Sequence, residues 1–290
     1  MISMLDQYTL IWSTNWKYLI ILDACRYDYF ERVYKDYSTL RLGKLKKVLS
    51  PGSSTTEWLE KIFQGRECKD TVYISANPYI NSKGLSYRGF DPKPIASRFY
   101  KVIDVWDWGW DERLSTVHPR EVNKAVLVAS RLYPNKRLII HYIQPHFPYL
   151  SLAREGIITE VLKIKIYKER GPVATRFMDK VRGFIRWKIF WKLLGERGSK
   201  LAFKLVGKPL DYNELIARRL GVEGLRGAYE ENLKLVLSYV GKLTSHLKRR
   251  GLVVITADHG ELLGERGLFG HPSGMREPEL VEVPWLEIAP

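Results

Sequence analysis

The chain has 290 residues, 45% of them hydrophobic, which is enough for one large core or for one core with an appendage. Its 47 Lys and Arg against 32 Asp and Glu give a net charge of +15, which favours an anionic partner such as a phosphate polymer, an anionic lipid or an anionic substrate. The chain has two cysteines, Cys25 and Cys68, which are too few for a disulfide framework or a zinc finger. It shows no leader pattern and no apolar stretch of ~20 residues, so we expect a cytoplasmic protein.

The first predicted strand is the apolar run at residues 18–22, which ends at Asp23. A helical pattern follows as far as residue 33, so this carboxylate is expected at the exit of a strand. The commoner use of such an Asp is to cap the next helix, and a metal ligand is the alternative. Arg26, three residues later, is a candidate for binding a substrate anion or for a surface ion pair.

Four hydroxyl residues occupy positions 53–56, directly before a helical pattern that Gly65 ends. Free amide N–H groups and the helix dipole favour an anion at such a helix start. Ser54 and Glu57 also have the spacing of a capping box, in which the hydroxyl only caps the helix. Both interpretations of the cluster follow from the pattern.

The middle of the chain places a histidine on a loop. Residues 71–75 are a predicted strand, and residues 79–118, rich in aromatic residues, Gly and Pro, are predicted to be irregular covering structure. The apolar run at residues 138–140 is a buried strand that continues into His141, which we expect to be buried and structural. His146 follows between two prolines, so it is predicted to lie on a rigid loop past a strand end.

Two helices with apolar stripes are predicted, one from residue 119 and one over residues 229–247. Between them, residues 161–210 carry 14 basic and three acidic residues, so their net charge of +11 (14 − 3) is most of the total. Residues 176–194 have the pattern of a basic amphipathic helix with aromatic anchors, which suits peripheral contact with an anionic membrane or packing over the core as a lid. No nucleic-acid-binding motif accompanies this charge, so specific nucleic-acid recognition is not expected.

The last predicted strand, residues 252–255, delivers Asp258 and His259 to its carboxyl end. A carboxylate oxygen and a neutral imidazole nitrogen can together bind a divalent cation. The alternation of strands and helices predicts an α/β fold whose mostly parallel central sheet is covered by helices on both faces. Because ligands of such sheets lie beyond the carboxyl ends of the strands, the polar residues at these exits are expected to meet there.

Together these motifs resemble the alkaline phosphatase superfamily, and within it the sulfatase-like branch. Residues 256–271, TADHGELLGERGLFGH, are similar over their whole length to the late metal motif of that branch. Residues 145–148, PHFP, are similar to its Pro-His-x-Pro loop, and Asp23 after Leu22 matches the first strand with its metal-binding Asp. The resemblance covers residues of about 17–65, 137–149 and 228–290.

The resemblance implies an alkaline phosphatase-like core formed by residues 1–150 and 211–290, with residues 151–210 as a basic helical insertion. It also implies a divalent cation (Zn, Mn, Ca or Mg) and an anionic phosphate- or sulfate-ester substrate. Two-metal phosphatases need an Asp and a His four residues apart for their second site. Here His146 is followed at that spacing by Leu150, so one cation is expected. The metal ligands carried over from the family are Asp23, Ser54, Asp258, His259 and His271.

The resemblance also suggests a nucleophile. In the family this residue lies at a helix start, two residues before a frequent Pro, and alignment on Glu57 puts that Pro at Thr56. Ser54 is therefore the first choice and Thr55 the second. His146 would bind the transferred oxyanion, and His271 would be a metal ligand or the acid that protonates the leaving group.

The function implied is a metal-dependent hydrolase or transferase that acts on phosphate esters through a covalent phospho-enzyme. Residues 54–58, STTEW, lack the Pro and Arg that formylglycine formation needs. A sulfuric ester hydrolase that works without formylglycine is therefore one alternative. A non-catalytic scaffold that binds membrane or polyanion through its basic segment is the other.

Overall fold

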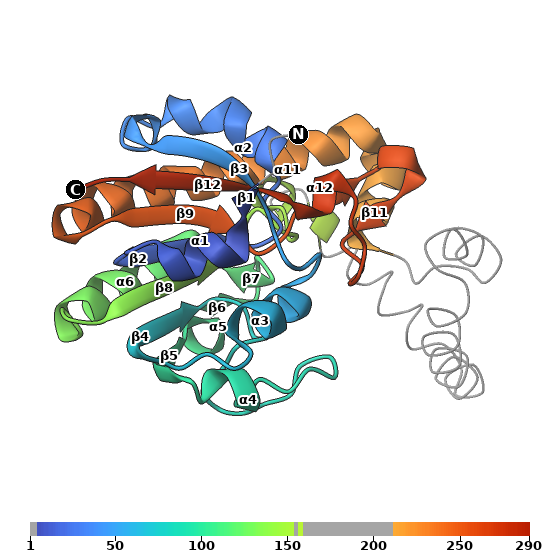
Figure 1. Ribbon diagram of the computed structural model, residues 1–290. Coiled ribbons are helices and arrows are strands. Elements are labelled where there is room, and N and C mark those ends of the chain that lie inside the picture. The colour runs from blue at the N-terminus through green and yellow to red at the C-terminus, as the bar shows by residue number, and fades with distance from the viewer. Residues whose placement is uncertain (1–4, 154–155, 159–210) are drawn as a thin grey trace.

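The computed structural model describes residues 5–153, 156–158 and 211–290. These residues build one eight-stranded sheet in the order β1-β3-β12-β9-β2-β8-β4-β5, in which β12 runs antiparallel to both neighbours and the other pairs are parallel (Figure 1). The strands are β1 (Leu5–Asp6), β2 (Tyr18–Leu22), β3 (Lys44–Leu49), β4 (Cys68–Ser75), β5 (Phe99–Asp104), β8 (Arg137–Tyr142), β9 (Val253–Ala257) and β12 (Glu282–Ile288).

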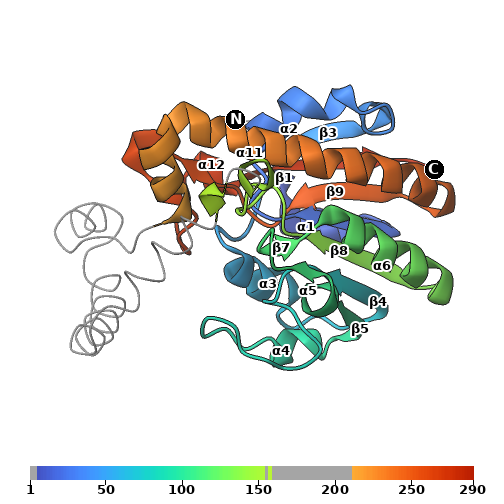
Figure 2. The same ribbon diagram turned by 180° about the vertical axis from the view of Figure 1, so that it is seen from behind.

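Helices cover both faces of this sheet, as the sequence predicted. Helices α2, α6 and α11 lie along one face (Figure 2), and α1 and α3 lie on the other (Figure 1). The helices are α1 (Gln7–Ser13), α2 (Tyr27–Val33), α3 (Thr55–Phe63), α4 (Lys93–Ala96), α5 (Val105–Trp108), α6 (Pro119–Leu132), α7 (Leu150–Ala153), α11 (Tyr212–Leu247) and α12 (Pro278–Val281). Every residue of β2 and β9 is buried, because these central strands have helices on both sides.

Shorter elements complete the described part of the chain. Two small antiparallel pairs form outside the main sheet, β6 (Trp110–Asp111) with β7 (Thr116–Val117) and β10 (Leu262–Leu263) with β11 (Phe269–Gly270). The single-turn 3-10 helices are Tyr34–Asp36, Leu40–Leu42, Lys248–Arg250 and Glu265–Gly267.

The helix predicted over residues 229–247 is part of the longer α11, whose buried stripe contains Leu233, Val236 and Val240. The first turns of α11 are set off from the rest by Gly221, which has the non-helical values φ 77 and ψ 166. This bend separates the start of the helix at Tyr212 from the part that packs on the sheet.

The prediction of irregular structure over residues 79–118 is wrong in part. Residues 99–104 form β5, which pairs with β4 at the edge of the sheet. Its residues alternate only partly between buried and exposed, so the strand depends on pairing with β4 rather than on a strong pattern of its own.

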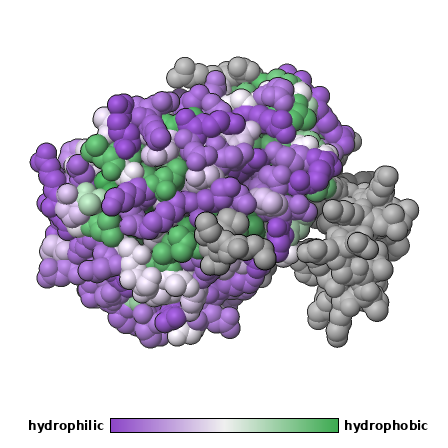
Figure 3. All heavy atoms as spheres, turned by 45° about the horizontal axis from the view of Figure 1, so that its top comes forward, coloured by the Kyte–Doolittle hydropathy of each residue, from purple (hydrophilic) through white to green (hydrophobic). Residues whose placement is uncertain are grey.

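The predicted basic insertion lies outside the described residues, apart from residues 151–153 and 156–158. None of the described helices combines the length and apolar character that a membrane span requires. On the face shown in Figure 3, hydrophobic residues form separate patches within a largely hydrophilic surface.

Candidate active site

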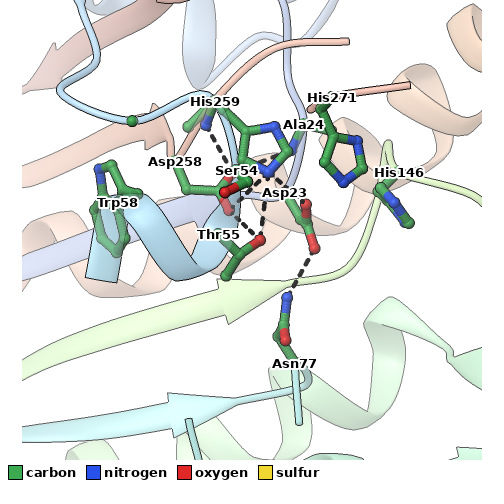
Figure 4. A network of polar contacts seen from close by, with 12 residues as sticks. Asp23, Ala24, Ser54, Thr55, Trp58, Asn77, His146, Asp258, His259 and His271 are labelled. Carbon is green, nitrogen blue, oxygen red and sulfur yellow. Dashed lines mark hydrogen bonds and ion pairs between the residues drawn. The ribbon is translucent and has the colours of Figure 1, made fainter. Parts of the chain in front are cut away.

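Four predicted site residues meet at the carboxyl edge of the sheet: Asp23, Thr55, Asp258 and His259 (Figure 4). Asp23 follows β2, and Asp258 and His259 follow β9, whose register with β2 forces the two exits to lie together. His259 Nε2 lies 3.6 Å from Asp23 Oδ1 and 3.4 Å from Asp258 Oδ2. We call these four residues the strand-end cluster.

Of the candidate nucleophiles, Thr55 points into this cluster. It is the first residue of α3, and its hydroxyl donates to Asp258 Oδ2 at 2.7 Å and lies 3.3 Å from His259 Nε2. Ser54 is the N-cap of α3, where its Oγ accepts the amide of Glu57. The structure thus gives Ser54 the capping contact that the sequence offered as the alternative, and it brings Thr55, the second choice for the nucleophile, to Asp258 and His259.

Neighbouring backbone groups fix Asp258 and His259 in place. Asp258 Oδ1 accepts the amides of Ala24 at 3.1 Å and of His259 at 2.8 Å. His259 Nδ1 donates to the Gly260 carbonyl at 2.8 Å, so Nε2 presents its lone pair to the cluster. Only glycine fits at position 260, because a Cβ there would lie 2.0 Å from the Glu279 carbonyl oxygen.

Asn77, at the end of β4, contributes a contact that sequence reasoning missed. Its amide donates to Asp23 Oδ2 at 2.8 Å, while Asp23 Oδ1 is buried without a hydrogen-bond partner among the described residues. Asp23 is not the cap of α2, because that helix begins at Tyr27 with Arg26 as its N-cap. An Asn before a Pro indicates a turn, so no signal in the sequence pointed to Asn77.

A second group of side chains lies beside the first. His146 is on the loop between two prolines, and His271 follows β11 and donates from Nδ1 to Glu261 Oε1 at 3.0 Å. The ring centroids of His146 and His271 are 5.0 Å apart, and those of His259 and His271 are 4.5 Å apart. We call His146, Glu261 and His271 the loop cluster. Glu261 had no assigned role in the sequence prediction, although it belongs to the late motif.

Burial and mutual repulsion set the charges of these groups. Burial, reinforced by Asp258, raises the pKa of Asp23 well above its ordinary value. Burial and the nearby His271 lower the pKa of His146 to about 3 and that of His259 well below its ordinary value. Burial opposes protonation of His271 too, but Glu261 outweighs it and raises the pKa of His271 to about 9. At neutral pH, His146 is therefore neutral and His271 is protonated.

Each cluster brings together carboxylate and imidazole groups that can hold a divalent cation, in the loop cluster only after His271 has lost its proton. In each, the oxygen and nitrogen atoms of the carboxylates and imidazoles lie within 4.8 Å of one another. Two buried carboxylate oxygens, Asp23 Oδ1 and Glu261 Oε2, have no hydrogen-bond partner among the described residues, and a cation would satisfy them. The sequence predicted one cation, and Glu261 gives the fold a second place for one.

Arg26 lies close to the site but is occupied by other groups. Its guanidinium pairs with Asp28 at 2.8 Å and with Glu265 at 2.7 Å, and it donates to the Glu261 carbonyl at 3.3 Å. The side chain is buried, so its ion pairs are not the surface pairs that the sequence offered as one alternative. We therefore give Arg26 no part in substrate binding.

Comparisons with family models and with curated protein sequences find no match. Solved structures are similar in fold. The soluble domain of lipooligosaccharide phosphoethanolamine transferase A from Neisseria meningitidis shares 15% identity at a TM-score of 0.52, with 93% of this chain and 75% of that chain covered. The integral membrane protein of that name shares 14% identity at a TM-score of 0.56, with 95% of this chain and 48% of that chain covered. This chain therefore spans about half of its length.

Two further structures extend the comparison. The phosphonate monoester hydrolase of Agrobacterium radiobacter has 14% identity and a TM-score of 0.51, covering 94% of this chain and 67% of that chain. A C-terminal periplasmic domain from Escherichia coli, EcEptC in complex with Zn, has 14% identity and a TM-score of 0.50, covering 98% and 74%. These similarities confirm the predicted alkaline phosphatase-like fold.

The same comparison corrects the expected location. The sequence predicted a cytoplasmic protein from the lack of a leader and of a spanning segment. Chains of this fold include a periplasmic domain and an integral membrane protein, which contradicts that prediction. A leader pattern and a spanning stretch are features outside the catalytic fold, so their absence from this sequence could not settle the compartment.

Proposed function

We propose, from the alkaline phosphatase superfamily fold of this chain, that it is a metal-dependent enzyme that transfers a phosphoryl group from an ester to water or to an alcohol. The observation that carries the proposal is the position of the Thr55 hydroxyl, 2.7 Å from Asp258 Oδ2 and 3.3 Å from His259 Nε2 at the start of a helix. A reactive hydroxyl, a cation site and free helix amides thus converge at one point.

Each residue has a role that its contacts support. Thr55 is the nucleophile, and Asp23, Asp258 and His259 hold the divalent cation, which when bound would lower the pKa of a nearby hydroxyl and offset negative charge on the phosphate. Asn77 and the amide of Ala24 orient the two carboxylates. These positions support a capping role for Ser54 and favour Thr55 as the nucleophile.

The loop cluster supplies the groups that contact the transferred phosphate and the leaving group. Neutral His146 accepts or donates one hydrogen bond to a phosphoryl oxygen, which helps to fix the phosphate in line with Thr55. Protonated His271 gives its Nε2 proton to the departing alkoxide, and Glu261 stabilises the imidazolium before that transfer.

The reaction has two displacements at phosphorus. The Thr55 hydroxyl gives its proton to Asp258 Oδ2, which accepts its hydrogen bond, and Thr55 Oγ forms a bond to phosphorus while the bond from phosphorus to the leaving oxygen breaks. The leaving alcohol departs with the proton from His271. Water or an acceptor alcohol then attacks the phosphothreonine and gives its proton to neutral His271, while the bond from phosphorus to Thr55 Oγ breaks and Oγ takes its proton back from Asp258. Water as acceptor makes the enzyme a hydrolase, and an alcohol makes it a transferase.

Paired variants test the nucleophile. We expect Thr55→Ala to lower turnover of p-nitrophenyl phosphate by ~10³-fold or more and to abolish a phosphopeptide containing residue 55 in mass spectra of quenched reactions. The matched control Ser54→Ala should lose a helix cap and the hydrogen bond to the Ser273 hydroxyl, with turnover within about threefold of wild type. The reverse result, a silent Thr55→Ala and an inactive Ser54→Ala, would return the nucleophile to Ser54.

Parallel substrates test the reaction class. We expect turnover of p-nitrophenyl phosphate or of its phosphodiester, and little turnover of p-nitrophenyl sulfate. Preference for the sulfate would make the protein a sulfuric ester hydrolase. Metal-loaded protein that turns over none of the three and binds anionic vesicles would support the scaffold alternative. Product analysis with added alcohols distinguishes a transferase from a hydrolase.

A further inference from the structure

The segment between β4 and α4 contains a tight hairpin with an unusual tip. Tyr87 and Phe90 exchange backbone hydrogen bonds at 3.1 and 3.0 Å, which leaves Arg88 and Gly89 as a two-residue turn. Both turn residues have positive φ, 48 for Arg88 and 85 for Gly89. Turns of this type favour Asn followed by Gly, because most side chains adopt positive φ only at an energetic cost.

The strained residue is also held by aromatic side chains. The Arg88 guanidinium lies 5.4 Å from the ring centroid of Tyr87, and the Tyr87 and Tyr79 rings pack edge to face at 5.0 Å. Tyr87 and Tyr79 also raise the pKa of Arg88. Arg88 is exposed and forms no ion pair with a carboxylate of the described residues.

The hairpin belongs to the rim of the proposed active site. The Tyr79 amide donates to Asn77 Oδ1 at 3.0 Å, and the amide of Asn77 holds Asp23. In Figure 1 the segment between β4 and α4 projects past α4 towards the side on which β8 and β9 end. One route of contacts therefore leads from Arg88 to a metal-binding carboxylate.

The opposite side of this rim contributes aromatic rings as well. Tyr212, at the start of α11, stacks on Phe147 with centroids 4.6 Å apart, and Phe147 follows His146 directly. Tyr212 is one of the groups that raise the pKa of Arg88, so the start of α11 lies within electrostatic reach of the guanidinium. Arg88 is thus a cationic group on the hairpin that follows Asn77.

We propose that Arg88 binds a second anionic group of the substrate, one that belongs to the leaving group and not to the phosphate that is transferred. The inference rests on the proposed phosphoryl-transfer site and adds a substrate class, esters whose leaving group carries its own phosphate or carboxylate. A guanidinium fork that has no carboxylate partner among the described residues suits an oxyanion. Arg at this positive φ is more strained than Asn would be, and local strain of this kind often accompanies a functional residue.

A series of ligands tests the second site by binding, without turnover. The probes are straight-chain alkane bisphosphonates from propane to octane, each compared with the alkylphosphonate of the same length, titrated calorimetrically into the zinc-loaded full chain. We expect the bisphosphonate of the right length to bind ~10-fold more tightly than its monophosphonate partner, and shorter ones to show no preference. Equal affinities at every length would overturn the second site.

The variant Arg88→Asn separates this role from a structural one. We expect it to abolish the preference for the bisphosphonate, to leave alkylphosphonate binding unchanged, and to raise the melting temperature by about 2 °C because the turn is relieved. Ser115→Asn is the matched control, because Ser115 also has a positive φ of 51 in a turn, between β6 and β7. It should stabilise the protein without altering the preference.

Two outcomes distinguish failure of the inference from failure of the proposed function. If Arg88→Asn keeps the full preference of the wild type, the second anion site is wrong while the phosphoryl site stands. If neither ligand class binds the zinc-loaded chain and Thr55→Ala leaves turnover unchanged, the proposed function is wrong and the inference fails with it.

Discussion

The strand-end cluster and the loop cluster lie side by side but are held in different ways. Asp23 and Asp258 follow strands that pair in register, and a buried Gln7 ties the site together by donating to the Ala257 carbonyl at 2.6 Å and accepting from Trp58 of α3 at 2.9 Å. Backbone geometry of the core therefore places the strand-end cluster.

The loop cluster depends on side chains for its position. Asn232 of α11 donates from Nδ2 to three carbonyls of the His146 loop, those of Pro145 and His146 at 3.1 Å and of Pro148 at 3.2 Å. Glu261, fully buried, holds His271. The sheet therefore positions the strand-end cluster, whereas we expect single substitutions outside the sheet to displace the loop cluster.

The largest effect is expected in the strand-end cluster. Asp258→Asn removes a charge that faces Thr55, His259 and the proposed cation, so we expect loss of bound metal and a fall in turnover of at least ~10³-fold. Metal analysis and p-nitrophenyl phosphate turnover check this. Asp70→Asn, which removes an exposed ion pair with Arg137, is the control and should change neither. Normal metal content in Asp258→Asn would contradict the assignment.

A smaller effect is expected from the loop cluster. Glu261→Gln removes the carboxylate that holds His271 protonated, so turnover should fall ~10–100-fold while the strand-end cluster still binds one equivalent of metal. Metal analysis alongside turnover tests the separation. Complete loss of metal in this variant would show that the two clusters bind cations only together.

The loop that carries His146 offers a third test. Asn232→Ala leaves three buried carbonyls without a donor, so we expect about 2–3 kcal/mol lower free energy of unfolding and a further ~10-fold loss of turnover. Denaturant unfolding and steady-state kinetics measure both. Asn123→Ala removes two hydrogen bonds, from the Tyr142 hydroxyl and to the Tyr239 carbonyl, and should lower stability alone. An equal loss of turnover in both variants would make the effect one of general stability.

The smallest effect is expected on the pH dependence of stability, through Glu265, which pairs with the buried Arg26. Burial alone would raise the pKa of Glu265, but its bond to Arg26 holds that pKa below the ordinary 4.5. A depressed carboxyl pKa stabilises the fold above the unfolded pKa and loses that contribution as pH falls through the folded one. We expect Glu265→Gln to lower the unfolding free energy by about 1–2 kcal/mol at neutral pH, and the difference from wild type to shrink below pH 4.5.

Urea unfolding at a series of pH values measures this difference. Glu223→Gln is the control, because Glu223 is exposed and pairs with Arg226 at the surface, so its effect should be within about 0.5 kcal/mol at every pH. A Glu265→Gln difference that stays constant down to pH 3 would contradict the proposed charge pairing.

The order of strands and helices was readable from the sequence because the central strands are continuous apolar runs that end in polar residues. Asp23, Asp258 and His259 were predicted for this reason, and they meet. His141 was correctly expected to be buried, and its Nδ1 contacts the Tyr73 hydroxyl at 2.8 Å. The sequence did not predict the edge strand β5, because β5 has no regular alternation of buried and exposed residues and forms a strand by pairing with β4.

The sequence by itself determined which segments end in candidate site residues, since an apolar run followed by a carboxylate or imidazole predicts the exit of a buried strand in an α/β chain. Tertiary structure decided which side chains reach the site. Successive residues at a helix start point in different directions, so only the docking of α3 shows that Thr55 and not Ser54 faces Asp258. Asn77 and Glu261 gained their partners from strands and loops far away in the chain, and such long-range contacts leave no local pattern.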